Sequence, residues 1–293
     1  MVASADSGAG HPGEVATYRC AIDDFGTGRA ISEGWTMLAL REAQAAELAS
    51  HVKAALKPPA LGAFHGKAYM RRFREQYVSV LQALRTALES SEERVAVCTL
   101  LDQQWKSTFK AFAARVIPNA FTNAGAAIDD NASALSHLAL PLFELQRHAH
   151  AHLAHGGSTT VEIDADDVTR QLVNSSVRAQ GCDIPALRVG RSIWEASRKL
   201  NFPAAPSLVR DGLSICDDET SPLIQVVDLL GNFSTAYVTV ALGRTSKTLE
   251  EKRGILDEVF GDLIRGSDFS GVELDGDSDI RLKETGAFTL TFA

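Results

Sequence analysis

One stretch of this 293-residue chain, SPLIQVVDLLGNFSTAYVTVAL at positions 221–242, is apolar on almost every side and carries a single acidic residue, Asp228. A helix that is hydrophobic all round has to be buried, so the stretch predicts a nearly fully buried helix. An unpaired carboxylate in such a helix costs on the order of several kcal/mol unless it is paired or binds a metal ion. Asp228 is therefore expected to form a buried salt bridge, cap a neighbouring element, or bind a metal.

Length and composition favour one large α/β domain or two modest ones. Hydrophobic residues make up 45% of the chain and charged residues 23%, which is ordinary for a soluble globular protein with a sizeable core. The four cysteines are scattered without a C-x-x-C pair, which predicts reduced thiols in a cytoplasmic protein. We expect no membrane span, because we find no run of about 18 apolar residues. Residues 1–16 lack the features of an export signal and predict a flexible lead.

The formal net charge of −8 limits the partners that the chain can bind. Affinity for nucleic acid comes largely from neutralising phosphates, so a basic surface here has to be local. The best candidate is the group Lys67, Arg71, Arg72 and Arg74, which by itself favours a solvated helix face. Net acidity argues against broad nucleic-acid affinity, but it is compatible with a nuclease whose acidic cluster is neutralised by bound cations.

Apolar periodicity outlines a chain of strands and helices. We expect strands at 18–22, 31–41, 94–101, 159–164 and 212–220, the last running into acids. We expect helices at 42–56, 67–90, 167–180, 221–242 and 247–266, and a mostly helical insertion at about 103–155 with interruptions at Pro118, 123–125 and Pro141. These elements predict one α/β domain over residues 17–265, followed at 266–293 by an acidic tail with an edge strand.

Acidic residues stand where predicted strands end. Asp23 and Asp24 follow the first strand, and Asp164 ends the strand at 159–164. Strand ends in α/β folds converge on one edge of the sheet, where Asp228 on its buried helix would make a third carboxylate. Such an oxygen-rich site suits Mg²⁺ or Mn²⁺. Two such ions, about 4 Å apart, clamp the attacking and leaving oxygens of a phosphodiester, so the pattern predicts metal-dependent cleavage of nucleic acid.

Three segments resemble the domain-of-unknown-function family 3800. AIDDFGTG at 21–28 is similar to the IDESG signature that opens the family, and FHGK at 64–67 is similar to its histidine motif. CDDETSPLIQVVDLLGN at 216–232 is similar to its closing signature, DSK-x-S-x-x-LQLADLLAG, and matches at Ser221, Gln225, Asp228, both leucines and Gly231.

The resemblance implies a ribonuclease-H-like mixed sheet flanked by helices, and a metal-dependent nuclease. It assigns the metal ligands to Asp23, Asp164 and Asp228. Asp24, which falls where the family has Glu, would be a further metal ligand. Asp217 would be another metal ligand or would hydrogen-bond to one. His65 would orient a phosphate or shuttle a proton.

Motifs of other enzyme classes are incomplete in this sequence. The sequence D-D-F-G-T is close to the phosphatase motif D-x-D-G-T, but Phe25 stands where the general acid belongs and cannot donate a proton. We find no G-x-S-x-G motif and no glycine-rich phosphate loop. The main alternative is a catalytically attenuated ribonuclease-H-like subunit that binds a protein partner, since Asp24 and Phe25 depart from the family motif.

The histidine-rich segment RHAHAHLAHGG is a second candidate metal site. His148, His152 and His155 recur on one face of the predicted helix. We find no nearby carboxylate in the sequence to complete a ligand set, and polar residues before Gly-Gly suit the C-terminal end of a helix. We therefore favour helix termination over metal binding for this segment.

Overall fold

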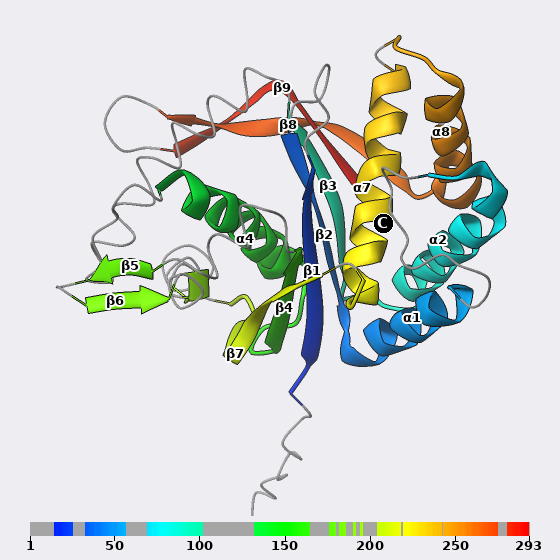
Figure 1. Ribbon diagram of the computed structural model, residues 1–293. Helices are drawn as coiled ribbons and strands as arrows, with labels where there is room; N and C mark the ends of the chain where they lie inside the picture. Colours follow the sequence, from blue (N-terminus) through cyan, green and yellow to red (C-terminus); the bar gives the residue numbers. More distant parts are fainter. Residues whose placement is uncertain are drawn as a thin grey trace, which may run out of the picture.

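The computed structural model describes residues 15–25, 33–56, 69–101, 132–164, 176–179, 182–185, 190–191, 194–195, 204–217, 219–241, 243–274 and 280–292. These residues form an α/β fold with a seven-stranded mixed sheet and helices on both of its faces (Figure 1). Among them, β5 (Ser176–Ala179) and β6 (Cys182–Pro185) pair with each other in a separate antiparallel ribbon.

The order of strands in the large sheet is β7-β4-β1-β2-β3-β9-β8. The strands, in chain order, are β1 (Thr17–Phe25), β2 (Glu33–Arg41), β3 (Val95–Leu101), β4 (Ser158–Asp164), β7 (Ser207–Cys216), β8 (Ile264–Leu274) and β9 (Ile280–Phe292). β1, β4 and β7 are parallel neighbours, whereas β1, β2 and β3 form an antiparallel meander. The carboxyl ends of β1, β4 and β7 therefore meet at one edge.

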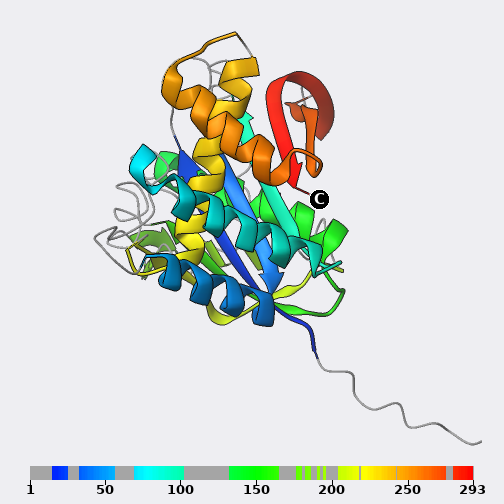
Figure 2. The same cartoon turned by 90° about the vertical axis from the view of Figure 1, so that its right-hand side faces the viewer.

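The helices divide between the two faces of the sheet (Figures 1 and 2). One face, called the α7 face below, is covered by α1 (Glu42–Ala55), α2 (Arg74–Glu89), α7 (Pro222–Ala241) and α8 (Lys247–Phe260). The opposite face, called the α4 face, is covered by α4 (Ala132–His152). A short 3-10 turn at Arg71–Phe73 precedes α2.

The predicted buried helix is confirmed as α7, which lies between the sheet and the outer helices. Its apolar side chains pack against Ala21, Leu38 and Cys98 of the sheet and against Leu256 and Phe260 of α8. α7 is the one described helix that is long and apolar enough to cross a membrane, and 72% of its most apolar window is buried inside the fold. This burial is compatible with a soluble protein, in which α7 is the core helix.

Several boundaries differ from the sequence-based expectation. β1 continues through Asp23 and Asp24 to Phe25, because β2 pairs with it along this whole length. The long helix expected from residue 67 begins at Arg74. α4 runs through Pro141, because burial of its apolar side chains beyond the proline offsets one missing backbone hydrogen bond.

Two further expectations differ from the structure because strand pairing decides the structure of these segments. Residues 176–179, expected at the end of a helix, form β5 instead. The expected edge strand of 266–293 is a hairpin of β8 and β9. β9 lies inside the sheet beside β3, and β8 is the edge. Residues 1–14 and 102–131, which contain most of the predicted lead and the first part of the insertion, lie outside the described residues.

Two arginines of the predicted basic helix face are paired with glutamates of α8. Arg71 forms an ion pair with Glu251, and Arg74 forms one with Glu258. These pairs tie the start of α2 to α8, whereas the guanidinium of Arg72 lies over the ring of Phe73, 4.7 Å from its centroid. Lys67 lies outside the described residues.

Candidate functional site

Two of the predicted acids, Asp23 and Asp164, lie on neighbouring strands. β1 and β4 pair in parallel through Ile22 and Ile163, and the two aspartates are the next residue on each strand. Side chains at matching positions of paired strands point to the same face, and the strands are about 4.8 Å apart. The two carboxylates therefore belong to the same edge and the same face of the sheet.

Asp23 lies under α7 and is only 4% exposed. Its neighbours across the sheet are Thr36 on β2 and Cys98 on β3, and the Thr36 hydroxyl donates to the Cys98 Sγ at 3.6 Å. The pKa of Cys98 is raised to about 12, mainly by burial and also by the negative charge of Asp23, while hydrogen bonds with Thr36 and Ser234 act in the opposite direction. Asp23 is thus a buried carboxylate close to Cys98 and to α7.

Asp228 is half-buried on α7, and the side-chain amide of Asn232 donates to its Oδ1 at 3.1 Å. Ser221 precedes Asp228 by two helical turns and contacts Glu162 on β4. α7 and β1 run in the same direction in Figure 1, and β4 is parallel to β1. The step from Ser221 to Asp228 covers about 10 Å of helix, and the step from Glu162 to Asp164 covers about 7 Å of strand. From Ser221 onward, α7 therefore advances in the same general direction as β4 does toward Asp164.

A buried cation also lies near Asp228. Lys252 of α8 is 7% exposed, and its Nζ lies 5.8 Å from the ring centroid of Phe233. Burial lowers the pKa of Lys252, and the negative charge of Asp228 opposes that shift. Lys252 is therefore the candidate partner of Asp228 in a buried salt bridge, which is the alternative to metal binding by Asp228.

The remaining predicted site residues are placed differently. Asp24 follows Asp23 on a regular strand, so its side chain points to the α4 face and is not brought together with Asp23. Asp217 follows β7 and is exposed, and its carbonyl accepts from Ser221 N at 2.9 Å in the turn before α7. His65 lies outside the described residues.

Among the described residues, no three histidine, cysteine, aspartate or glutamate side chains are close enough to form a ready metal-binding group. The fold brings Asp23 and Asp164 to matching positions, and it brings Asp228 over the sheet on α7. Carboxylate oxygens of this kind fit a hard cation such as Mg²⁺ or Mn²⁺. The donor chemistry therefore fits the expected metals, and the described side chains do not form a closed cage.

The histidine-rich segment separates into two ring pairs at the end of α4. His148 stacks on His152 with ring centroids 6.1 Å apart, and His150 stacks on His155 at 6.2 Å. His155 follows the helix and does not join the face formed by His148 and His152. Gly156, with φ of 79°, turns the chain in a conformation that favours glycine. The segment therefore forms the C-terminal end of α4 and the turn that follows it.

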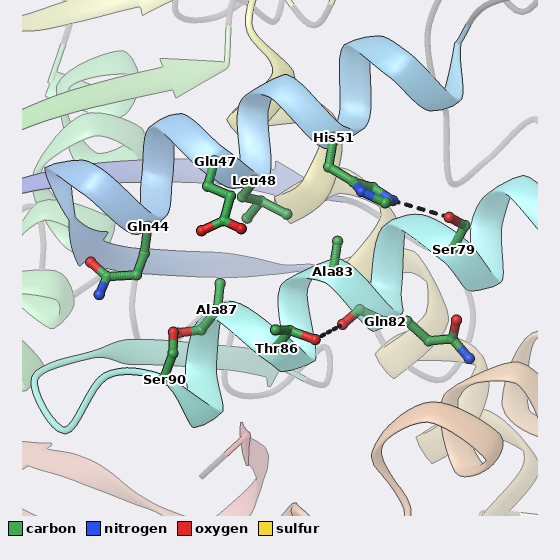
Figure 3. A pocket seen from close by; sticks show the side chains of 10 residues that line it. All are labelled: Gln44, Glu47, Leu48, His51, Ser79, Gln82, Ala83, Thr86, Ala87 and Ser90. Carbon is green, nitrogen blue, oxygen red and sulfur yellow. Dashed lines mark hydrogen bonds between the residues drawn. The ribbon is translucent and has the colours of Figure 1, made fainter.

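A groove of about 490 Å³ lies between α1 and α2, on the outer surface of these helices (Figure 3). His51 on α1 and Ser79 on α2 lie 3.0 Å apart across it, between Nε2 and Oγ. The groove is lined by Gln44, Glu47, Leu48, His51, Ser79, Gln82, Ala83, Thr86, Ala87 and Ser90. None of these is a predicted site residue, so the groove is separate from the acids.

Sequence reasoning missed three residues near the acids: Arg19, Glu162 and Lys252. Arg19 and Glu162 form an ion pair on the α7 face. Strand alternation could have predicted that Arg19 and Glu162 share a face with the acids, because they precede Asp23 and Asp164 by even numbers of residues. For Lys252 we find no comparable local signal, since its burial depends on how α8 packs on α7.

No family model, curated protein or solved structure matches this chain. The resemblance to family 3800 therefore stays a prediction from the quoted motifs.

Proposed function

We propose that this protein is a divalent-metal-dependent nuclease or phosphodiesterase of ribonuclease-H-like type. The observation that carries the proposal is the matching position of Asp23 and Asp164 at the carboxyl ends of β1 and β4, on the face covered by the helix that carries Asp228. Asp23 and Asp164 are far apart in sequence, and the third acid of the proposal, Asp228, lies on the helix that covers their face of the sheet. An ordinary turn or cap role would account for each acid separately but not for the matching positions of Asp23 and Asp164.

The ribonuclease-H-like part of the proposal is supported by where the acids stand. The resemblance implies an acid on the first strand, one on a later strand and one on a late helix. In this fold the first strand lies inside a mixed sheet, between parallel β4 and antiparallel β2, and the late helix α7 packs on it.

In this proposal Asp23, Asp164 and Asp228 hold Mg²⁺ or Mn²⁺. When bound, the cations lower the pKa of an attacking water and stabilise the leaving oxygen of the phosphodiester. The protein's own contribution is to fix the carboxylates. Asp23 is held in a rigid strand under α7, where little water competes for its oxygens. The proposed substrate is nucleic acid, and the metal would also screen its phosphates from the acidic protein.

We also propose a cytoplasmic location. The support is that Cys20, Cys98 and Cys216 are free thiols. Burial raises the pKa of Cys20 and of Cys98 to about 12, so both remain protonated. Buried unpaired thiols suit a reducing compartment.

The test is a cleavage assay on single- and double-stranded DNA, RNA and a DNA–RNA hybrid with Mn²⁺ or Mg²⁺. We expect cleavage by the wild type and a loss of about 100-fold or more in Asp23→Asn and Asp228→Asn, as is common when a group acting on the transition state is removed. Asp257→Asn is the control, because Asp257 lies on α8 and pairs with Arg253 at 3.4 Å. No cleavage of any substrate, together with identical Mn²⁺ binding by wild type and Asp228→Asn, contradicts the proposal.

The second candidate is the catalytically attenuated subunit that binds a protein partner. Lys252 beside Asp228 favours it, because a buried ion pair would account for the acid without a metal. The two candidates differ in one measurement. If Asp228 pairs with Lys252, Asp228→Asn strongly destabilises the protein whether or not Mn²⁺ is present. If Asp228 is a metal ligand, Asp228→Asn abolishes the stabilisation of the protein by Mn²⁺.

A further inference from the structure

One hydrogen-bonded group links the three elements that carry the candidate acids. Arg19 of β1 and Ser221 before α7 both donate to the side chain of Glu162 on β4, one to each carboxylate oxygen. The Ser221 hydroxyl also accepts from the backbone N–H of Ile224 at 3.3 Å, so it caps the first turn of α7. Arg19, Glu162 and Ser221 are called the β1–β4–α7 bridge below.

Each member of the bridge stands on the same face of its element as a candidate acid. Arg19 lies four residues before Asp23 on β1, and Glu162 lies two residues before Asp164 on β4. Even spacing on a strand keeps side chains on one face. Ser221 lies seven residues before Asp228, which is two turns of helix. Each bridge residue therefore precedes a candidate acid on the same face of its strand or helix.

We infer that the β1–β4–α7 bridge is the positioning device of the candidate site, holding α7 at the height and rotation that direct Asp228 toward Asp23 and Asp164. The inference rests on the proposed function. Carboxylates gathered at one place repel one another, so besides the apolar packing of α7 a polar contact near its start helps to hold the helix against the sheet. Charge-assisted hydrogen bonds to Glu162 supply that contact at the start of the helix.

Glu162 is a positioning residue and not a ligand, although it shares the face of Asp164. Its two oxygens already accept from Arg19 and Ser221, and its side chain is only 14% exposed. The ion pair with Arg19 also offsets its charge. The bridge thus assigns Glu162 a role in holding β1, β4 and α7 together, which is different from the ligand role proposed for Asp164.

The test is calorimetric titration of the full chain with MnCl₂, using wild type, Glu162→Gln, Ser221→Ala and Ser221→Thr. Residues that hold metal ligands in place change metal affinity by about 10-fold to 100-fold when replaced. We expect a loss of about tenfold or more in Glu162→Gln and Ser221→Ala, and recovery in Ser221→Thr, which keeps the hydroxyl. Hydrogen exchange at residues 222–229 without metal should rise in Ser221→Ala.

Glu93→Gln is the matched control. Glu93 also accepts from an arginine, Arg41, and from a hydroxyl, that of Tyr18, but it lies at the opposite end of β1 from Asp23. It should bind Mn²⁺ like the wild type, which separates positioning from a general loss of stability. Equal weakening in Glu93→Gln overturns the inference.

The remaining outcomes separate the two proposals. Wild-type affinity in both Glu162→Gln and Ser221→Ala, with unchanged hydrogen exchange, overturns the bridge and leaves the proposed function in place. A wild type that binds no Mn²⁺ overturns the proposed function, and the inference with it.

Discussion

The guanidinium Nη2 of Arg147 lies 3.1 Å from the Nε2 of His148 near the end of α4. A guanidinium group can only donate, so Nε2 of His148 accepts and the imidazole is neutral, with its proton on Nδ1. The pKa of His148 is lowered to about 3, mainly by burial and also by the charges of Arg147 and His152. The histidine that the sequence offered as a metal ligand is therefore a neutral, buried group.

His148→Asn should make the stability of the protein less dependent on pH. The folded pKa of about 3 lies below the unfolded value of about 6.5, so the contribution of His148 is complete above pH 6.5 and is lost as pH falls toward 3. The loss approaches about 1.4 kcal/mol per pH unit within that range. Urea unfolding at pH 7, 6, 5 and 4 measures it. If the unfolding free energy of His148→Asn falls with pH as steeply as that of the wild type, the prediction is contradicted. His51→Asn, on the exposed side of α1, is the control and should keep the wild-type pH dependence.

Glu93→Gln should destabilise the protein at neutral pH and be harmless in acid. Burial raises the pKa of Glu93, but the hydrogen bonds from Tyr18 and Arg41 and the charge of Arg41 outweigh it, so the net pKa is lowered. A depressed pKa gives stability that is present above the unfolded value and is lost as pH falls through the folded value. We expect a cost of about 1 kcal/mol at pH 7, since the pair is partly exposed. Guanidinium unfolding at pH 7 and pH 3 checks it, and an equal difference at both pH values would refute it.

Asp164→Asn should raise the thermal stability of the metal-free protein and abolish its stabilisation by Mn²⁺. Without a cation, the carboxylates of Asp23 and Asp164 repel each other from matching positions on adjacent strands. A bound cation stabilises only the folded state, by an amount that grows with the ratio of its concentration to Kd. Thermal unfolding with EDTA and with MnCl₂ measures both effects. A wild-type response to Mn²⁺ in the variant would exclude Asp164 as a ligand.

Phe233→Ala should be among the most destabilising substitutions in the described core. Phe233 is fully buried on α7, and its ring lies 5.9 Å from Tyr69 and 6.0 Å from Tyr77, between ring centroids. Removing a buried phenyl ring costs about 3–5 kcal/mol through lost contacts and a cavity. Chemical denaturation measures the loss, with Phe233→Leu as a control that keeps most of the volume. A loss in Phe233→Ala no larger than in Phe233→Leu would contradict this.

Local patterns were enough to predict most of the elements in the described chain. The alternation in residues 159–164 and the all-round apolar character of residues 221–242 each report the burial of one element, so β4 and α7 were predicted nearly to their ends. The acids were also visible, because a carboxylate stands out at the end of an apolar strand or inside an apolar helix. That Asp24 points away from Asp23 follows only once β1 is known to continue through both residues.

The sequence by itself determined that this is an α/β chain with a buried late helix and with acids at the ends of two strands. Only the tertiary structure decided that Ile22 pairs with Ile163, that β9 enters the sheet beside β3, and that α8 neutralises Arg71 and Arg74. The physical reason is the sequence separation of the residues that interact. Periodicity records whether a side chain is buried, whereas register and ion-pair partners depend on residues more than a hundred positions away, whose choice is made by packing.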